Sequence, residues 1–420
     1  MMSKLIIEGG KPLKGELRVH GAKNSTLPLL AACVLCKSPC VIHNCPELSD
    51  VDAACKILKH LGCRVEKQDD CVLVDAAGIN CCTIPESLMR EMRSSIVFLG
   101  AIVARMGHAH ISSPGGCELG PRPIDLHLAA LRRLGLIIDG EHGFLDCQTK
   151  GRLHGETIAL SFPSVGATEN IMLAASMAKG TTRIINAARE PEISDLAAFL
   201  NQCGAKVRGA GESLIEIEGV DSLHGCEHRV IPDRIVATTY LSAVATTGGD
   251  LELTDVVHEH LAPILPLFRE AGCLVTEEQN RLHLRAPEHL MPLACVRTMP
   301  YPGFPTDAQA PMMVLSTRAI GTSMYVENIF ENRYKHVPEL VRMGASIKLE
   351  GKVAVVEGVP ALFGANVLAT DLRGGAALVL AGLVAEGITE VRGVHHIDRG
   401  YVNIEKAMQA LGGRIQRADG

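Results

Sequence analysis

The residues best suited to chemistry in this sequence are a set of cations, one aspartate and one thiol. The cations are Lys23, Arg93, Arg122, Arg333, Arg373 and Arg399, the aspartate is Asp307 and the thiol is Cys117. Guanidinium groups hold carboxylates and phosphates through paired, charge-assisted hydrogen bonds, and an ammonium group adds a point charge. If the fold brings these side chains together, they predict a site for a small ligand that carries several negative charges.

Cys117 lies in a segment, residues 113–123, that contains three glycines and three prolines. This composition predicts a long loop, and loops often carry functional side chains. A thiol near cationic groups can act as a nucleophile or a proton donor. Because Cys117 is one of 15 cysteines, an exposed thiol without a function is the alternative that the local pattern leaves open.

Unusual polar residues fall at the expected beginnings of helices. One set stands at or before the starts of apolar helices, and it comprises Lys23-Asn24, Arg93, Ser164, Asp233-Arg234, Thr306-Asp307, Asp371 and Arg373. A second set precedes amphipathic helices, and it comprises Cys117 with Arg122, Arg189-Glu190, Glu331-Asn332-Arg333 and Asp398-Arg399. Helix N-termini offer free N–H donors and a positive dipole end, which favour anions. For any single member, an ordinary cap or a weak surface ion pair is the alternative.

The elements that must position these residues recur six times along the chain. In each copy an amphipathic helix ends at a glycine that is followed by a short alternating strand, and the glycines are Gly62, Gly135, Gly204, Gly272, Gly344 and Gly412. Their spacing of 68 to 73 residues indicates an internal repeat. A glycine after a helix commonly adopts a left-handed conformation. A second helix in each copy, such as 171–178, is apolar nearly all round and therefore belongs inside a core.

The repeat unit is predicted to be β-α-β-α-β-β, and three such units make a domain of ordinary size. We predict two pseudo-threefold domains with apolar helices inside and sheets outside. Domain I is expected to comprise 1–22 plus 232–420, with the N-terminal strand completing its last unit, and domain II to comprise 23–231 with the Cys117 loop. The crossings near Gly21 and Val230-Ile231 are expected to act as a hinge.

Composition weighs against several classes of protein. The formal charge is −6, with no Trp and five Tyr, which disfavours a nucleic-acid partner that needs cations and stacking rings. The N-terminus has no apolar run typical of a signal peptide, and no segment has the apolar length of a membrane helix, so no membrane association is expected. Fifteen cysteines in such a chain predict reduced, mostly buried thiols and a cytoplasmic location.

Metal and nucleotide cofactors are also disfavoured by the local patterns. Cys33 and Cys36, followed by Cys40 and Cys45, raise the alternative of zinc, but the first two lie in an apolar helix and no matching pair with histidine follows. His258-Glu259-His260 and His395-His396 lack further ligands. No glycine-rich phosphate loop of the Walker or dinucleotide type opens a βαβ unit. We therefore expect no metal and no cofactor.

Motifs along the whole chain resemble those of the enolpyruvyl transferase family, and within it the enzymes that act on UDP-N-acetylglucosamine. In the first half these motifs are Gly21-Ala22-Lys23-Asn24, Pro114-Gly115-Gly116-Cys117, Gly120-Pro121-Arg122-Pro123-Ile124-Asp125-Leu126-His127 and Ser164-Val165-Gly166-Ala167-Thr168. In the second half they are Gly303-Phe304-Pro305-Thr306-Asp307, Phe330-Glu331-Asn332-Arg333, Thr370-Asp371-Leu372-Arg373 and His396-Ile397-Asp398-Arg399-Gly400-Tyr401. Together these motifs are highly specific, whereas any one alone would be weak.

The resemblance implies an inside-out α/β barrel in two domains, with the active site in the cleft between them. It implies transfer of the enolpyruvyl group of phosphoenolpyruvate to the 3-hydroxyl of UDP-N-acetylglucosamine with release of phosphate, the first committed step of peptidoglycan synthesis. No further protein partner is implied. Both the addition and the elimination need charged groups that are held in position.

The resemblance also implies roles for individual residues. Cys117 would protonate C3 of phosphoenolpyruvate and form a covalent adduct, and Asp307 would be the base near the sugar hydroxyl. Phosphoenolpyruvate would be bound by Lys23, Asn24, Cys117, Arg122, Arg373 and Arg399, of which Lys23 and Arg399 would also serve catalysis. The nucleotide sugar would be bound by Arg93, Arg122, Pro123, Ile124, Asp125, Leu126, His127, Ser164, Val165, Gly166, Asp307, Ile329 and Arg333. A cysteine at position 117 implies inactivation by fosfomycin.

The chain departs from some family members at Phe162 and near Ser49, where they have basic residues, and at Tyr301, where they have histidine. These departures affect the expected diphosphate contacts.

Three rival functions remain to be separated: a 5-enolpyruvylshikimate 3-phosphate synthase, a non-catalytic nucleotide-sugar sensor, and an RNA-processing relative. The first usually has a Lys-Ser pair near the N-terminus that this chain lacks, the second would lose Cys117, Lys23 or Asp307, and the third fits poorly with the acidic composition.

Overall fold

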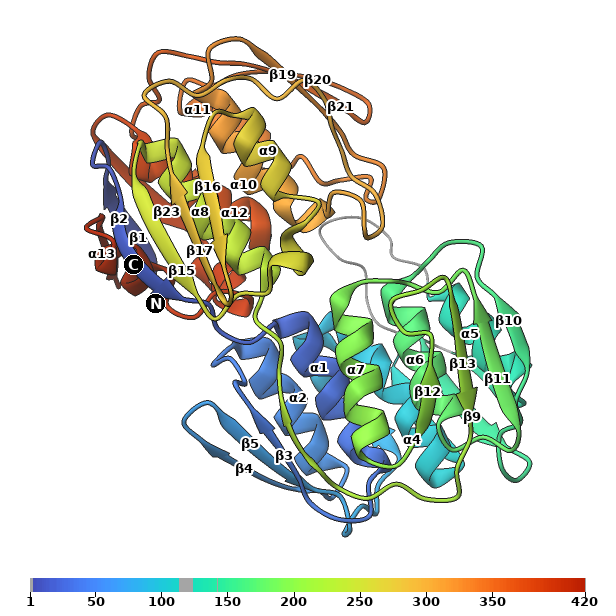
Figure 1. Cartoon of the computed structure of the whole chain (residues 1–420). Helices are drawn as coiled ribbons and strands as arrows, with labels where there is room; N and C mark the ends of the chain where they lie inside the picture. Colours follow the sequence, from blue (N-terminus) through green and yellow to red (C-terminus); the bar gives the residue numbers. More distant parts are fainter. Residues whose placement is uncertain (1–2, 113–123, 142, 420) are drawn as a thin grey trace. The chain divides into compact units, whose positions relative to one another are not determined.

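The computed structural model describes residues 3–112, 124–141 and 143–419 of the 420-residue chain. The described residues divide into two compact units. One unit contains residues 3–20 and 232–419, and the other contains residues 21–112 and 124–231. In Figure 1 the strands of each unit lie around its own helices.

The unit formed by residues 21–231 contains three repeats, and each alternates strands with helices. The first repeat comprises α1 (Lys23–Ala32), η1 (Cys33–Leu35), β3 (Cys40–His43), α2 (Ser49–His60), β4 (Arg64–Gln68) and β5 (Cys71–Asp75). The second comprises β6 (Thr83–Ile84), α3 (Glu86–Glu91), η2 (Arg93–Val97), α4 (Phe98–Met106), β7 (His108–Ser112), α5 (Asp125–Arg133), β8 (Leu136–Glu141) and β9 (Phe144–Thr149). The third comprises β10 (Thr157–Ala159), α6 (Val165–Ala175), β11 (Thr181–Ile185), α7 (Pro191–Gln202), β12 (Lys206–Arg208) and β13 (Leu214–Glu218), and β14 (Glu227–Arg229) follows it.

The unit formed by residues 3–20 and 232–419 has the same organisation. Its first repeat comprises β2 (Lys14–Arg18), α8 (Arg234–Thr247), β15 (Asp250–Thr254), η3 (His258–Leu261), α9 (Leu265–Glu270), β16 (Leu274–Glu278) and β17 (Arg281–Arg285). The second comprises β18 (Val296–Arg297), α10 (Thr306–Thr317), β19 (Thr322–Val326), α11 (Val337–Arg342), β20 (Ser346–Glu350) and β21 (Val353–Glu357). The third comprises β22 (Asn366–Leu368), α12 (Leu372–Val384), β23 (Ile388–Arg392), η4 (Val394–Arg399), α13 (Ile404–Ala410), β24 (Arg414–Ala418) and β1 (Lys4–Glu8).

The described strands form six four-stranded sheets of one topology. In the sheet β10-β11-β13-β12, the outer strand β10 runs parallel to β11, and the other pairs are antiparallel. The other sheets are β6-β7-β9-β8, β14-β3-β5-β4, β16-β17-β15-β2, β18-β19-β21-β20 and β22-β23-β1-β24. The repeated β-α-β-α-β-β unit is thereby confirmed.

Three strands complete sheets whose other strands lie far away in the sequence. β14 pairs in parallel with β3, so the first repeat of its unit is completed by residues from the end of that unit. β2 pairs in parallel with β15, and β1 lies between β23 and β24. The sequence indicated the exchange for the N-terminal strand but not for β14 or β2. Each exchange fills a sheet position that a purely tandem repeat would leave empty.

Six helices form the interior, three in each unit. Helices α8, α10 and α12 pack against one another, and α4 packs against both α1 and α6. The buried hydroxyls of α8 have hydrogen-bond partners, because they donate to backbone carbonyls one turn earlier. Thr238 donates to the Arg234 carbonyl, and Ser242 donates to the Thr238 carbonyl. The strands alternate between buried and more exposed positions, as β15 does, so one sheet face packs on these helices. This arrangement confirms that the apolar helices lie inside and the sheets outside.

The glycine that ends each amphipathic helix is left-handed in all six repeats. Gly62, Gly135, Gly204, Gly272, Gly344 and Gly412 have φ angles between 87° and 98°. A side chain in this region of φ is sterically disfavoured, so glycine is the natural residue where the chain leaves the helix.

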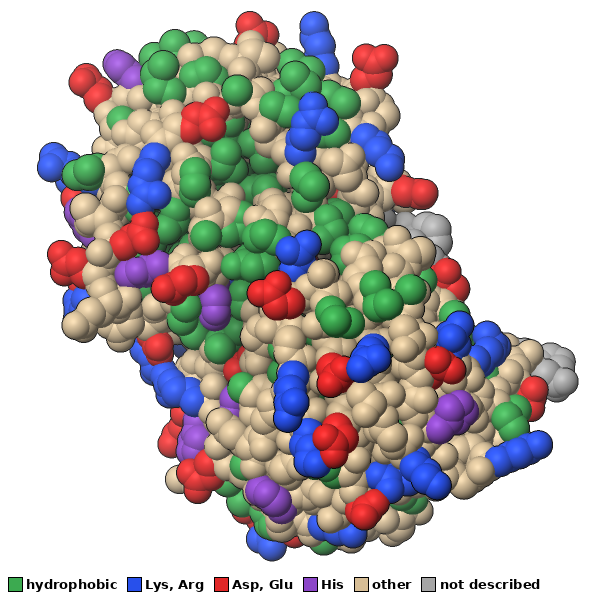
Figure 2. All heavy atoms as spheres, turned by 45° about the vertical axis from the view of Figure 1, so that its right-hand side comes forward, with side chains coloured by type: hydrophobic (Ala, Val, Ile, Leu, Met, Phe, Trp, Pro, Cys, Tyr) green, Lys and Arg blue, Asp and Glu red, His purple; other side chains and the backbone are tan. Residues whose placement is uncertain are grey.

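The surface carries charges of both signs. Figure 2 shows lysine and arginine interspersed with aspartate and glutamate over the visible face. None of the described helices has the length and apolarity that would let it cross a bilayer.

Candidate active site

The N-terminal ends of α10 and α12, together with the segment before α11, bring an aspartate against two buried arginines. Asp307, in the first turn of α10, accepts a hydrogen bond from Arg333 Nη2 at 2.8 Å through Oδ1. Its Oδ2 accepts from Arg373 Nε at 3.3 Å and Nη2 at 3.2 Å. Arg333 and Arg373 are 3% and 2% exposed, whereas 27% of the Asp307 side chain is accessible. The group therefore carries a net positive charge and presents its carboxylate towards solvent.

Arg373 is positioned to hold an anion. Its guanidinium lies 5.3 Å from the centre of the Tyr401 ring, and its Nη1 makes no hydrogen bond among the residues that the structure describes. Burial alone would disfavour the charge, but Tyr401 and Asp307 outweigh it and raise the pKa of Arg373 above its ordinary value. A buried guanidinium with an unused N–H donor is suited to a carboxylate or phosphate.

A buried glutamate that sequence reasoning missed organises the segment before Arg333. Glu327 is 1% exposed, and its Oε1 accepts from the backbone N–H of Ile329 at 2.9 Å and of Phe330 at 3.0 Å. Its Oε2 accepts from the hydroxyl of Thr306 at 3.0 Å. Glu327 thus links the predicted ligand-binding residue Ile329 to the start of α10 beside Asp307.

Some polar residues of the first predicted set are helix caps. Asp233 Oδ1 accepts from the N–H groups of Ile235 and Val236, and Asp371 Oδ1 accepts from Arg373 and Gly374. These side chains satisfy orphan donors at the starts of α8 and α12. For Asp233 and Asp371, the cap that the sequence left as an alternative is the structural role.

Arg399 and Tyr301 belong to the same unit as Asp307. Arg399 is the last residue of η4 and is half-buried, two residues before Tyr401. Tyr301 donates its hydroxyl to the carbonyl of Glu259 at 2.9 Å, and the Arg234 guanidinium lies 5.5 Å from the centre of its ring. The tyrosine at this position therefore supports a cation at the start of α8.

In the other unit, α1 begins with a lysine that is paired to a buried carboxylate. Lys23 Nζ lies 3.2 Å from Asp50 Oδ2, and their side chains are 10% and 3% exposed. Asn24 is exposed beside it. Asp50 was not a predicted site residue, because an aspartate in the first turn of α2 looks like an ordinary helix charge.

The predicted nucleotide-binding residues of α5 and α6 adjoin one another. Asn170 lies between them, with Nδ2 placed 2.9 Å from both His127 Nδ1 and the Ile96 carbonyl, while its Oδ1 accepts from Gly100. A Cβ at Gly166 would approach His127 Cε1 to 3.0 Å, so the glycine allows the two segments to approach closely. Ser164 caps α6 by accepting from the Ala167 N–H at 3.3 Å. Val165, Asp125, Leu126 and Ile124 are at least partly accessible beside these residues.

His127 is neutral at ordinary pH. Burial lowers the pKa of His127 to about 4, although Asp125 opposes this shift. Because Nδ1 faces the Asn170 amide, Nε2 carries the proton of the neutral ring. His127 therefore offers an N–H donor beside Gly166.

The structure describes the remaining predicted residues to different extents. Cys117, Arg122 and Pro123 lie outside the described residues, and Arg93 is described only by its place at the start of η2. Phe162 is 42% exposed and Ser49 is exposed at the start of α2.

Comparison with known proteins assigns the chain to a family. Residues 7–408 match the family of EPSP synthase (3-phosphoshikimate 1-carboxyvinyltransferase). UDP-N-acetylglucosamine 1-carboxyvinyltransferase 2 of Caldanaerobacter subterraneus subsp. tengcongensis is 52% identical, over 99% of this chain and 100% of the relative. UDP-N-acetylglucosamine 1-carboxyvinyltransferase 1 of Carboxydothermus hydrogenoformans is 48% identical, over 100% of this chain and 99% of the relative.

Solved structures show the same fold. The enolpyruvyl transferase NikO from Streptomyces tendae matches with a TM-score of 0.90 and 27% identity, over 100% of this chain and 99% of that one. EPSP synthase from Acinetobacter baumannii matches in fold with a TM-score of 0.80 at 18% identity, over 100% of both chains. The sequence match over nearly the whole chain confirms the resemblance, and the chain belongs to the EPSP synthase family of enolpyruvyl transferases.

Proposed function

We propose that this enzyme transfers the enolpyruvyl group of phosphoenolpyruvate to the 3-hydroxyl of UDP-N-acetylglucosamine and releases phosphate. The observation that carries the proposal is the 52% identity, along essentially the whole chain, to a UDP-N-acetylglucosamine 1-carboxyvinyltransferase. The reaction commits the nucleotide sugar to peptidoglycan, and so serves cell-wall growth, cell shape and division.

The reaction is an addition followed by an elimination. The sugar oxygen forms a bond to C2 of phosphoenolpyruvate and loses its proton, while C3 gains a proton and becomes a methyl group. C3 then gives up a proton, the C2–O bond to phosphate breaks, and the enol ether is left on the sugar. Each half needs an acid, a base and cations that offset the carboxylate and phosphate charges.

Residues of both units contribute to binding phosphoenolpyruvate in this proposal. Lys23 holds a charge beside Asp50, and Arg373 has an Nη1 donor without a hydrogen bond among the described residues. The complete set is Lys23, Asn24, Cys117, Arg122, Arg373 and Arg399. The lysine and the three arginines of this set would bind the anion and stabilise charge that develops on phosphate as it leaves.

The nucleotide sugar is assigned to the residues around α5, α6 and the segment before α11. The neutral His127 would donate its Nε2–H, and the N-terminus of α6 behind Ser164 would favour the diphosphate. The complete set is Arg93, Arg122, Pro123, Ile124, Asp125, Leu126, His127, Ser164, Val165, Gly166, Asp307, Ile329 and Arg333. Because His127 is already neutral well below pH 6, its protonation would not limit binding near neutral pH.

Asp307 is assigned as the base for the sugar hydroxyl. Two guanidiniums hold its carboxylate, and about a quarter of the side chain stays accessible at 27%. The arginines keep the carboxylate oriented, and they would offset the negative charge of the bound anion when the base takes up a proton.

Phosphate release tests the proposed acceptor. The full chain is incubated with phosphoenolpyruvate and either UDP-N-acetylglucosamine or shikimate 3-phosphate, and free phosphate is measured. We expect release only with the nucleotide sugar. Release only with shikimate 3-phosphate would assign the enzyme to the other activity, and binding of the nucleotide sugar without release would indicate a sensor.

The role of Cys117 has its own test. Fosfomycin should stop phosphate release and add its mass to the peptide that contains Cys117, and Cys117→Ser should lower kcat far more than it weakens binding of the nucleotide sugar. Activity that persists in fosfomycin with an unmodified Cys117 would remove this residue from the mechanism. Cys295→Ser is the matched control, because Cys295 is exposed.

A further inference from the structure

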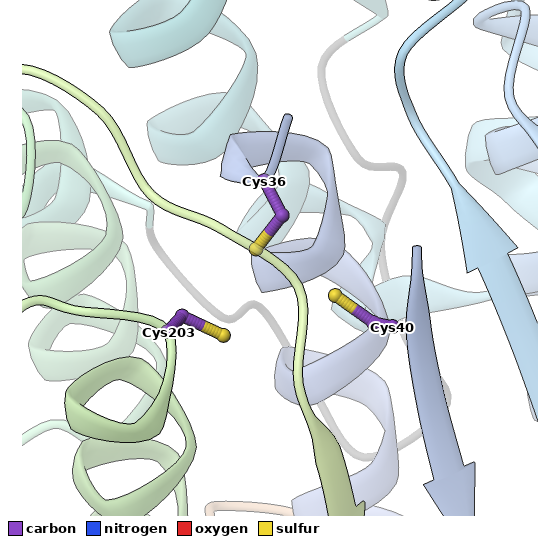
Figure 3. A group of neighbouring side chains, drawn as sticks. All are labelled: Cys36, Cys40 and Cys203. Carbon is purple, nitrogen blue, oxygen red and sulfur yellow. The ribbon is translucent and has the colours of Figure 1, made fainter. Parts of the chain in front are cut away.

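A group of cysteines from distant segments converges inside the unit formed by residues 21–231. The sulfur atoms of Cys36, Cys40 and Cys203 all lie within 4.8 Å of one another, and all three residues are fully buried. Figure 3 shows the three thiols pointing towards a common space between the end of the α1–η1 segment, the start of β3 and the end of α7. Within the described part of the chain, this is the only group of three or more His, Cys, Asp or Glu residues with ligand atoms so close together.

A fourth sulfur adjoins the group. Cys226 Sγ lies 3.4 Å from Cys203 Sγ, and Cys226 is partly accessible just before β14. Cys33 is also near, but its thiol donates to the Leu29 carbonyl at 3.3 Å, a closer contact than the 3.9 Å between the Cys36 thiol and the Ala32 carbonyl. Cys36, Cys40, Cys203 and Cys226, which we name the thiol cluster, therefore provide four sulfur atoms, one of them on a residue that solvent reaches.

The spacing of these sulfurs fits a tetrahedral ion. Zinc binds thiolate at about 2.3 Å, so tetrahedral geometry places its sulfur ligands about 3.8 Å apart. The sulfurs of Cys36, Cys40 and Cys203 lie within 4.8 Å of one another, and Cys226 Sγ lies 3.4 Å from Cys203 Sγ, so these separations are close to the tetrahedral value. Soft thiolate ligands without carboxylates or carbonyls favour d¹⁰ ions such as Zn²⁺ over Mg²⁺ or Ca²⁺.

We propose that the thiol cluster binds one thiophilic divalent cation, with Zn²⁺ as the physiological type, in a structural site separate from the transferase chemistry. Each thiol that binds gives up one proton to solvent, and no electron is transferred. The sequence pattern argued against zinc because Cys33 and Cys36 lie in an apolar helix and no matching pair with histidine follows them. The remaining ligands are brought in by α7 and by the strand exchange that adds β14 to the first sheet.

The site would join the ends of elements that position Lys23. The α1–η1 segment begins at Lys23 and reaches its C-terminal end at Leu35, next to Cys36, while α7 ends next to Cys203. Near the start of α1, Ser25 donates a hydrogen bond to Asp195 of α7. A bound ion would therefore connect two segments at one end that Ser25 and Asp195 already connect at the other. An ion that binds only the folded state also stabilises it.

Cobalt is the probe for this site, since Co²⁺ replaces Zn²⁺ and reports thiolate ligands by absorption. The reduced, metal-free full chain is titrated with Co²⁺ and then with Zn²⁺, in the unsubstituted protein and in Cys40→Ser, Cys226→Ser and Cys273→Ser. Cys273 is a buried cysteine in the other unit and serves as the matched control. The readouts are the sulfur-to-cobalt charge-transfer bands, the tetrahedral visible bands and Tm, none of which depends on transferase activity.

We expect one equivalent of Co²⁺ with tetrahedral thiolate bands, displaced by Zn²⁺, and a Tm that rises with metal. Cys226→Ser should weaken binding at least tenfold while leaving three thiolates, Cys40→Ser should abolish the bands, and Cys273→Ser should match the unsubstituted protein. If Cys40→Ser does not fold, Cys226→Ser decides. The proposal is overturned by absence of thiolate bands, by bands that both cluster variants retain, or by conversion of Cys203 and Cys226 to a disulfide without metal uptake.

Discussion

The proposed base of this enzyme is a carboxylate that is paired with two buried guanidinium groups. Asp307 lies between Arg333 and Arg373, each of which is almost completely buried. Removing a carboxylate from two buried guanidiniums leaves charge without a close partner, which costs more than the loss of a surface pair. The same residue is the proposed base, so one substitution should affect both stability and chemistry.

Asp307→Asn is expected to lower kcat by about 10²–10⁴-fold, because the amide cannot accept the proton of the sugar hydroxyl. It should also lower the free energy of unfolding by on the order of 1–3 kcal/mol, because charge-assisted hydrogen bonds to two arginines are lost. Phosphate release and thermal unfolding measure the two effects. Asp255→Asn, which removes the carboxylate that pairs with the exposed Arg18, is the control and should change neither greatly. An unchanged kcat would show that Asp307 is not the base.

Glu169 on α6 is a second buried carboxyl, and it has no role in the proposed reaction. Burial raises the pKa of Glu169 well above its ordinary value, and the charges of Glu192 and Glu190 add to the shift. The folded protein therefore keeps the proton where the unfolded chain would release it. The contribution of this group to stability is complete below the unfolded pKa and is lost as pH rises towards the folded pKa.

Glu169→Gln should remove this pH-dependent loss, because glutamine has no proton to release. We expect the variant to have a higher Tm than the unsubstituted protein at pH 8, and this difference in Tm should shrink towards pH 5. The corresponding difference in the free energy of unfolding should change by up to about 1.4 kcal/mol per pH unit. Thermal unfolding across this range is the measurement. Glu212→Gln, in an exposed turn, should show no such trend. A difference that is constant with pH would contradict the assignment.

At the level of elements, the segment between β19 and α11 is positioned by one carboxylate. Glu327 accepts hydrogen bonds from Thr298, Thr306, Ile329 and Phe330, so it fixes both the start of α10 and the turn that carries Ile329. Arg333 follows in the same segment and donates to the Thr306 carbonyl at 3.0 Å. Glu327 is a positioning residue, because it acts through Thr306 and Ile329.

Glu327→Gln should raise KM for UDP-N-acetylglucosamine about tenfold and lower kcat less, because an amide N–H₂ would face groups that are themselves donors. Leaving such donors unsatisfied costs about 1–3 kcal/mol. Steady-state kinetics with varied nucleotide sugar separates the two constants. The exposed Glu350→Gln at the end of β20 is the control. A fall in kcat with an unchanged KM would instead place Glu327 in the chemical step.

Within the described part of the chain, the backbone passes from one unit to the other at residues 20–21 and 231–232. The proposed substrate residues include Lys23 and His127 in one unit and Asp307 and Arg373 in the other. Ligand binding that uses both sets would couple the units through these connections. Conformational closure of this kind excludes water and completes a catalytic site.

Saturating UDP-N-acetylglucosamine should therefore reduce the radius of gyration of the protein. Small-angle X-ray scattering with and without the nucleotide sugar measures this change, and UDP alone serves as the ligand control. A radius that stays the same under saturation, with binding verified by calorimetry, would count against coupling of the units.

Features that depend on local physical chemistry could be predicted from the amino-acid sequence. The six glycines are left-handed because a helix end requires that conformation, and the six apolar helices are buried because they have no polar face. The spacing of these signals predicted the repeat, and the motifs around Lys23, Asp307 and Arg399 predicted the family. These properties are encoded within a few residues, so they can be recognised without coordinates.

The contacts between distant segments could not be predicted in this way, because they depend on how the whole unit packs. The pairing of β14 with β3, the contact of Asp307 with Arg373, the burial of Asp50 against Lys23 and the convergence of Cys203 with Cys36 and Cys40 all join residues far apart in the chain. No local pattern marks Glu327 or Asp50, because an acidic residue in a turn or at a helix start is common on a surface. Their roles follow from burial and from the donors that surround them, which depend on packing across the whole unit.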